Sequence, residues 1–354
     1  MMEIYSALKA AWHTTDIAKL RAGQGIVPHQ VYLVISDLCN QDCSFCTHRS
    51  SAGWATEQFG EDTGKGFTMN PNRKISKEKC FELLDDFAEL GVKAIQFTGG
   101  GEPTVHPDLE SIVRYALDKK LQVGLVTNAT RLLSSRTLEQ LSWVRVSIDA
   151  GNRRTYEAMR KSKLWDKVIA NVDVLARISG PIVGANFVTT KENYKELVQF
   201  CILAKTLGVR YVKIAANLTT EGLSYYDGIL GKIMKQMAEA QRLVDGSFTI
   251  ANVFERRLED LRIGRPVHAF CGQQRFTTYI GGDLKVYRCC NTAYTHHGEI
   301  GDLREQRYRD WLAHEAPKNL DSFDARTCSH CQFHEKNEAI AYLVQSEPAH
   351  VEFV

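Results

Sequence analysis

Apolar and polar positions along the first 220 residues follow a pattern that predicts strands separated by helices. Six short apolar runs bounded by turn-forming residues favour buried strands at 31–36, 94–98, 122–127, 143–149, 181–189 and 209–216. Several segments between them repeat apolar residues at helical spacing, and we expect helices at 77–90, 109–120, 134–142, 167–179 and 193–208. Ser76 should cap the first of these helices, and Gly91 should end it.

Strands that alternate with helices predict an α/β fold with a parallel sheet and helical crossovers. Six units fall short of the eight that close a full barrel, so we expect a partial (β/α)6 TIM-like barrel over residues 30–250. We expect residues 1–29 to form an N-terminal extension and the polar, glycine-rich insertion at 47–75 to be a lid, with a disordered loop as the alternative. Beyond 250 the repeat stops, which predicts a small second domain at 251–354 with strands at 275–280 and 284–288.

Composition narrows the class of protein only a little. The net charge of +2 lacks the strong basic excess of a dedicated duplex DNA binder. No apolar run approaches the roughly 20 residues of a membrane span, and the first residues lack the pattern of a secretory signal. We therefore expect a cytoplasmic protein with no membrane partner. Cysteines stay reduced in that compartment, where clustered thiols more often bind metals than form disulfides.

Three of the ten cysteines lie within eight residues, directly after the first predicted strand: Cys39, Cys43 and Cys46. Zinc usually takes four ligands, and only His48 stands nearby as a fourth. A four-iron cluster normally takes four thiolates, so three thiolates would leave one iron open for catalysis. The loop is therefore a candidate site for a [4Fe-4S] cluster, with structural zinc as the alternative.

The segment CNQDCSFC resembles the signature of the radical S-adenosylmethionine (radical SAM) superfamily, Cys-x3-Cys-x-aromatic-Cys, with Phe45 at the aromatic position. The resemblance implies an enzyme whose open iron chelates the amino and carboxylate groups of S-adenosyl-L-methionine, with Phe45 near the adenine. It also implies reductive cleavage of the cofactor to a 5′-deoxyadenosyl radical, which abstracts hydrogen from a substrate carbon. The protein would supply positioning and exclude water.

Two turns that follow predicted strands strengthen this resemblance. In FTGGGEP, the residues at positions that line the methionine amino group in the family are Gly100, Gly101 and Glu102. In VTNAT, Thr127 and Asn128 resemble the family's Thr-Asn-Gly turn, although Ala129 stands where glycine is usual. A glycine-rich turn without a ligand is the alternative for the first motif.

Two further matches lie at and after the fourth predicted strand. Ser147 and Asp149 match positions that contact the ribose and methionine ends of the cofactor, although Asp149 could instead cap the next helix. Tyr156 and Arg160 resemble a Tyr-x3-Arg pair, in which Arg160 would bind the cofactor carboxylate. The alternative for Arg160 is a solvated helix face.

The remaining clustered cysteines resemble the auxiliary iron–sulfur modules called SPASM and twitch. That resemblance implies a second [4Fe-4S] cluster on Cys271, Cys289, Cys328 and Cys331. Five cysteines in this region are too few for two clusters, which favours the shorter twitch form. Structural zinc on the same four thiols is the alternative, and four nearby histidines support it: His296, His297, His330 and His334.

Cys290 directly follows one of these predicted ligands. Side chains alternate along a strand, so Cys290 should face away from Cys289 and toward the active site. A thiol there could donate a hydrogen atom to a product radical. A buried small residue or an alternative cluster ligand is the simpler interpretation.

Radical chemistry of this kind requires an electron donor, of flavodoxin or ferredoxin type, and a substrate that is a small molecule, a nucleotide or DNA base, or a peptide. The motifs CNQDCSFCTHR and FTGGGEPTVHP resemble a branch carried by bacteriophages. We therefore expect a redox-neutral isomerisation or epimerisation, with a thymine adduct in phage DNA as a candidate substrate. Dehydrogenation or cross-linking of a peptide or small molecule is the second interpretation, and a non-catalytic, zinc-stabilised binding module is an alternative of another class.

Overall fold

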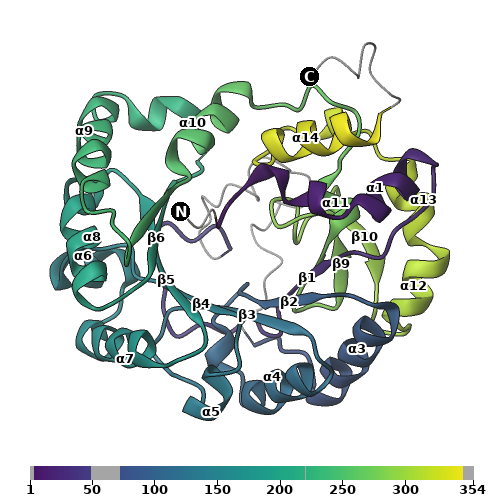
Figure 1. Ribbon diagram of the computed structural model, residues 1–354, viewed down its shortest axis with the longest axis horizontal. Coiled ribbons are helices and arrows are strands. Elements are labelled where there is room, and N and C mark those ends of the chain that lie inside the picture. Colours follow the sequence, from purple (N-terminus) through teal and green to yellow (C-terminus); the bar gives the residue numbers. More distant parts are fainter. Residues whose placement is uncertain (1–3, 49–71, 220, 346–354) are drawn as a thin grey trace.

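A single sheet organises the computed structural model, which describes residues 4–48, 72–219 and 221–345. In this part of the chain the strand order is β10-β9-β8-β1-β2-β3-β4-β5-β6-β7. Each of β1 to β7 runs parallel to its neighbours, and the helices lie outside the curved sheet (Figure 1). The α/β class and the partial barrel are therefore confirmed.

All six predicted strands are present: β1 (Gln30–Leu33), β2 (Ala94–Phe97), β3 (Gln122–Thr127), β4 (Trp143–Ser147), β5 (Ile182–Thr189) and β6 (Tyr211–Ala216). Strand β1 ends three residues earlier than predicted, because the chain beyond it pairs with the end of the insertion. Ser36 bridges Lys74 there, and the amide of Ile75 donates to the carbonyl of Ile35 at 2.9 Å. A seventh parallel strand, β7 (Thr249–Asn252), pairs with β6. It is largely half-buried and lacks the apolar run that marks the others.

The crossover helices are α3 (Lys77–Leu90), α4 (Leu109–Asp118), α5 (Ser135–Leu138), α6 (Arg153–Arg160), α7 (Trp165–Arg177), α8 (Leu197–Thr206), α9 (Leu230–Gln241) and α10 (Phe254–Ile263). The limits predicted for α3 are confirmed. The Ser76 hydroxyl accepts from the amide of Lys79, and Gly91 ends the helix with a left-handed φ of 91°. The helix predicted at 134–142 is reduced to the single turn of α5. Most of the predicted lid at 47–75 lies outside the described residues.

The C-terminal third consists of α11 (Gln273–Phe276), β8 (Thr277–Ile280), β9 (Lys285–Tyr287), β10 (Glu299–Asp302), α12 (Tyr308–His314), α13 (Ala316–Asp321) and α14 (His334–Val344). Strand β8 pairs in parallel with β1, so this part continues the sheet of the barrel. Val286 and Trp311 belong to the same apolar core as Val31. The division into domains at 250 stays a prediction, because sheet and core both run across it.

The N-terminal segment packs against this C-terminal part. The short helices η1 (Ala7–Trp12) and α1 (Thr14–Arg21) lie beside α14 (Figure 1). Ile17, Phe276 and Ile340 form a small apolar cluster between them. The predicted extension 1–29 is therefore packed onto the fold within its described residues.

A buried ion pair joins α3 to the start of α12. Asp86 on α3 is fully buried, and its carboxylate lies 2.6 Å from Arg307 and 3.1 Å from Arg309. Both arginines remain partly exposed, so the carboxylate bears most of the desolvation. The pair fixes the C-terminal part against the barrel's outer helices.

We expect Asp86→Ala to lower the free energy of unfolding by about 3 kcal/mol, at the lower end of the roughly 3–5 kcal/mol that breaking a buried pair costs, since both arginines can reach water. Glu89→Ala is the control, because Glu89 is the exposed partner of Arg309 and should change stability by less than about 0.5 kcal/mol. Urea unfolding measures both. Equal effects of the two variants would contradict the role given to Asp86.

Candidate active site

The loop after β1 carries the first three cysteines. Cys39, Cys43 and Cys46 are half-buried thiols. Burial raises the pKa of Cys39 to about 11, the backbone amide of Gln41 opposes that rise, and the negative charges of Glu102, Cys43 and Cys46 add to it. These thiols therefore lie within electrostatic range of one another. A bound iron cluster would reverse this effect, because metals hold thiols as thiolates.

The glycine-rich turn after β2 pairs directly with this cysteine loop. The amide of Gly101 donates to the carbonyl of Ser36 at 3.1 Å, and the amide of Glu102 donates to the carbonyl of Leu38 at 2.6 Å. Gly100 is buried in the same turn. Two motifs 60 residues apart in the chain thus form one unit at the carboxyl edge of the sheet, where ligands bind in parallel α/β folds.

Glu102 is buried, and chain donors surround its carboxylate. One oxygen accepts from the Thr127 hydroxyl at 2.6 Å and from the hydroxyl and amide of Thr104 at 2.7 and 3.1 Å. The other accepts from the amide of Asn128 at 2.6 Å. Burial raises the pKa of Glu102, and these donors offset part of the rise. The structure thus brings together three predicted cofactor residues, Glu102, Thr127 and Asn128, and bonds them to one another.

The turn after β3 also contacts the cysteine loop. Asn40 donates to the Thr130 hydroxyl at 2.7 Å and accepts from the side chain of Asn128 at 2.9 Å. Ala129, at the usual glycine position of this turn, has a left-handed φ of 55°. That conformation costs roughly 1–2 kcal/mol for a residue other than glycine. The turn therefore keeps the left-handed conformation that suits glycine, although the residue is alanine.

Arg160 is buried, so the interpretation as a solvated helix face is wrong. Its guanidinium pairs with the Asp149 carboxylate and donates to the sulfur of Cys43 at 3.4 Å. It also lies over the ring of Phe45, 5.5 Å from its centre. Burial alone would lower the pKa of Arg160, but the charges of Asp149 and Cys43 outweigh it and raise the pKa. Arg160 therefore links α6 to the cysteine loop.

Asp149 has a different role from the helix cap considered above. Its second carboxylate oxygen accepts from the amide of Val188 at 2.6 Å, while Asn152 caps α6. The capping interpretation is therefore wrong. Asp149 joins the ends of β4 and β5 to Arg160, and Ser147 ends β4 two residues earlier in a half-buried position.

A cavity of about 330 Å³ lies inside the barrel. Inward-facing residues of four strands line it: Tyr32 from β1, Gln96 from β2, Arg145 from β4 and Lys213 from β6. Thr98 and Gly99 of the glycine-rich turn also line the cavity. The cavity therefore connects the barrel interior with the edge that carries the candidate cofactor residues.

The four predicted auxiliary ligands come from three segments that the fold brings into electrostatic range. Cys271 precedes α11, Cys289 follows β9, and Cys328 and Cys331 precede α14. Burial raises the pKa of Cys328 and of Cys331 to about 12, and the charge of Cys271 raises both further. The charge of Cys271 also raises the pKa of Cys289, which burial already raises well above its usual value.

Donors and a histidine surround these sulfurs. The Cys331 sulfur accepts from the amide of Phe333 at 3.3 Å and from Asn337 at 3.7 Å, which suits a cluster-bound thiolate. His297 lies 3.4 Å from the Cys328 sulfur, so a nitrogen ligand stands beside the set. Among the described residues, no three His, Cys, Asp or Glu side chains are grouped closely enough to hold a single metal ion. Both ligand sets stay predictions.

Cys290 lies on the wall of the barrel cavity, and its sulfur accepts from the side-chain amide of Gln332 at 3.1 Å. Cys289 instead lies 3.6 Å from the hydroxyl of Thr292. Strand β9 ends at Tyr287, so strand alternation is the wrong reason for this arrangement. A turn beyond the strand separates the surroundings of the two thiols.

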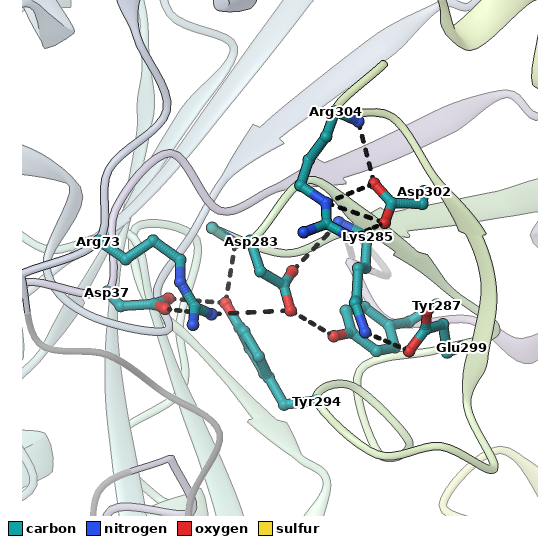
Figure 2. A network of polar contacts seen from close by, with 10 residues as sticks. Asp37, Arg73, Asp283, Lys285, Tyr287, Tyr294, Glu299, Asp302 and Arg304 are labelled. Carbon is teal, nitrogen blue, oxygen red and sulfur yellow. Dashed lines mark hydrogen bonds and ion pairs between the residues drawn. The ribbon is translucent and has the colours of Figure 1, made fainter. Parts of the chain in front are cut away.

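Sequence reasoning missed a partly buried polar network beside the cysteine loop (Figure 2). Tyr294 donates to Asp37 at 2.7 Å, and Tyr287 donates to Asp283 at 2.6 Å. Arg73 lies 3.4 Å from Asp37 and 3.7 Å from Asp283. The network joins the cysteine loop, the end of the insertion and the C-terminal hairpin. These residues lie far apart in sequence and share no periodicity, so no local signal marks them.

Comparisons with known proteins match the barrel. The family model of the radical SAM superfamily matches residues 33–204. Molybdenum cofactor biosynthesis protein 1 of Drosophila melanogaster is 32% identical over 158 residues, which cover 42% of this chain and 25% of that protein. AdoMet-dependent heme synthase of Methanosarcina barkeri is 30% identical over 176 residues, 48% of this chain and 45% of that protein. The chain spans less than half the length of these curated relatives.

A solved structure matches over nearly the whole chain. SuiB of Streptococcus suis, bound to its precursor peptide SuiA, has a TM-score of 0.62 at 15% identity and covers 95% of this chain and 76% of that chain. This likeness concerns the fold. No helix among the described residues combines the length and apolarity that crossing a membrane requires. Residues 33–204, in which the cysteine loop pairs with the glycine-rich turn, match the model of the radical SAM superfamily, whose cofactors are S-adenosylmethionine and a [4Fe-4S] cluster.

Proposed function

We propose that this protein is a radical SAM enzyme that holds its cluster on Cys39, Cys43 and Cys46 and acts on a substrate in the barrel cavity. One observation carries the proposal. The three thiols lie on a loop that the glycine-rich turn and the β3 turn hold in place, next to a cavity lined by polar side chains. Three thiolates leave one iron of a cubane open, as binding of S-adenosylmethionine requires.

When bound, the cluster and S-adenosylmethionine supply a 5′-deoxyadenosyl radical. The chain's own residues hold and orient these groups. Backbone at Gly100 and Gly101 would line the methionine amino group, and the ring of Phe45 would lie near the adenine. Arg160 is already paired with Asp149, and this pairing holds the guanidinium of Arg160 beside the sulfur of Cys43.

The reaction also needs a reductant and a substrate. We assign the electron donor to the flavodoxin or ferredoxin type. Cys271, Cys289, Cys328 and Cys331 would hold a second [4Fe-4S] cluster, supported by their mutual electrostatic range and by the amide donor at Cys331. Structural zinc with His297 as a ligand is the second candidate for this site, favoured by the short distance from His297 to Cys328.

For the reaction class we propose a redox-neutral isomerisation or epimerisation, in which Cys290 donates a hydrogen atom to the product radical. The S–H bond breaks and a C–H bond forms, leaving a thiyl radical on Cys290. One electron from the donor and one proton from water restore the thiol. The cavity position of Cys290 supports this role. A thymine adduct in phage DNA as the substrate stays a prediction.

Replacing Cys39, Cys43 and Cys46 together with alanine should abolish formation of 5′-deoxyadenosine with dithionite as reductant, because no thiolates remain for the first cluster. Iron should fall from about eight to about four per chain, the auxiliary cluster being retained. Cys201→Ala is the control, since Cys201 is buried in α8 and should leave cofactor cleavage intact. Undiminished cleavage in the triple variant would overturn the assignment.

Gly101→Ala tests how the cysteine loop is held. A Cβ atom at this position would lie 1.8 Å from the carbonyl oxygen of Leu38, so the two loops must separate. We expect loss of iron from the first cluster and slower 5′-deoxyadenosine formation. Gly231→Ala in α9, where nothing lies within 4 Å of the added carbon, should change neither. Full iron content and full rate in Gly101→Ala would contradict the proposal.

Cys290→Ala should retain the iron that Cys289→Ala loses, because only Cys289 is placed among the auxiliary ligands. With substrate present, Cys290→Ala should still form 5′-deoxyadenosine but give little product. Wild-type enzyme in deuterated water should place one solvent deuteron in the product, since thiol hydrogens exchange with water. Normal turnover in Cys290→Ala and a product without solvent deuterium would together return Cys290 to the role of a packed thiol.

A further inference from the structure

The barrel cavity contains more positive charge than its acidic groups can balance. Five cationic side chains line it: Arg145, Lys213, Arg256, Arg257 and Lys336. Glu335 lies 2.6 Å from Arg256, and Asp260 lies 3.7 Å from Arg257. Within the described part of the chain, the other three cations have no ion-pair partner.

Lys213 is the most exceptional of these three. It lies within β6, and the ring of Tyr5 is 5.5 Å from its ammonium group. Burial lowers the pKa of Lys213 well below its usual value, and the charges of Arg145 and Arg257 lower it further. Burial also lowers the pKa of Lys336. A desolvated cation without a counter-charge destabilises the empty protein, whereas a bound anion would remove that penalty.

Packing does not require these charges. Barrel interiors are usually filled by layers of bulky side chains, whereas in this one aromatic rings surround a second cavity of about 410 Å³ at the start of the strands. The ring of Trp143 fills the space at Gly124, and the ring of Tyr211 fills the space at Gly184. One layer further along the strands, Arg145 and Lys213 take the inward positions and border the cavity. The inward positions of β4 and β6 thus change from aromatic rings to cations without an ion-pair partner, and Arg145 and Lys336 border both cavities.

We propose that the substrate carries an anionic group, a phosphate or a carboxylate, which binds in the barrel cavity to Lys213, Arg145 and Lys336. The three cations come from β6, β4 and α14, so they surround the cavity from different sides. Cys290 also lines this cavity. The inference rests on the proposed function for its chemistry, but anion binding itself needs neither reductant nor turnover.

The test is calorimetric titration of the full-length, cluster-reconstituted protein with inorganic pyrophosphate and, separately, with glutarate, each in the presence of saturating S-adenosylmethionine. Lys213→Met should weaken binding at least about tenfold and raise the unfolding temperature, because it removes a buried, unpaired cation. Lys336→Met is a second test variant, in which the substitution lies on α14 instead of β6. Lys235→Met on the exposed face of α9 is the matched control and should bind like wild type.

Tighter binding of pyrophosphate indicates a phosphate-bearing substrate, and tighter binding of glutarate indicates a carboxylate-bearing one; both support the inference. No binding of either anion, or equal binding by Lys213→Met and Lys235→Met, overturns it. Competition between S-adenosylmethionine and pyrophosphate also overturns it, because the cations would then serve the cofactor. A wild-type protein that binds anions but forms no 5′-deoxyadenosine contradicts the proposed function alone.

Discussion

The buried carboxylate of Glu102 is the constraint on which the geometry of the candidate site depends. The backbone amide of Glu102 donates to the cysteine loop after β1. Its carboxylate oxygens accept from the neighbouring Thr104 and from Thr127 and Asn128 at the end of β3. A carboxylate without these donors would be costly to bury. The donors therefore hold the ends of three strands in one arrangement. Cluster ligands on a loop need such support, since a site is only as well defined as the residues that position it.

A buried ion pair, between Arg160 and Asp149, fixes the cysteine loop against β4 and β5 in the same way. Asp149 and Arg160 connect β4, β5 and α6, and Arg160 reaches Cys43. The network around Asp37 then ties the start of the cysteine loop to the C-terminal hairpin (Figure 2). Hydrogen bonds and ion pairs thus connect the two candidate metal sites, and the pairing of β8 with β1 links them further.

Sequence reasoning succeeded where the signal is local. Apolar runs located six strands, Ser76 and Gly91 set the limits of α3, and the three clustered cysteines do lie in the loop after the first strand, while their role as cluster ligands stays a prediction. It failed where long-range contacts decide. The pairing of β8 with β1 depends on the free edge that β1 offers in the sheet, and the spacing of apolar residues does not reveal that edge. Arg160 has an ordinary helical position in sequence, and only the approach of Asp149 and Cys43 explains its burial.

The barrel divides its strands between two tasks. Outward positions such as Val31, Val144 and Val212 are fully buried against the helices and supply the core, while the inward positions around the cavity include polar and charged groups. A domain of this size can bury enough apolar surface with one face of its sheet, so the other face is free to take side chains that weaken the fold. Unpaired cations in that interior lower the stability of the empty protein. Such cations are most simply explained by a bound ligand whose negative charge offsets them. Binding of the substrate then also stabilises the folded protein.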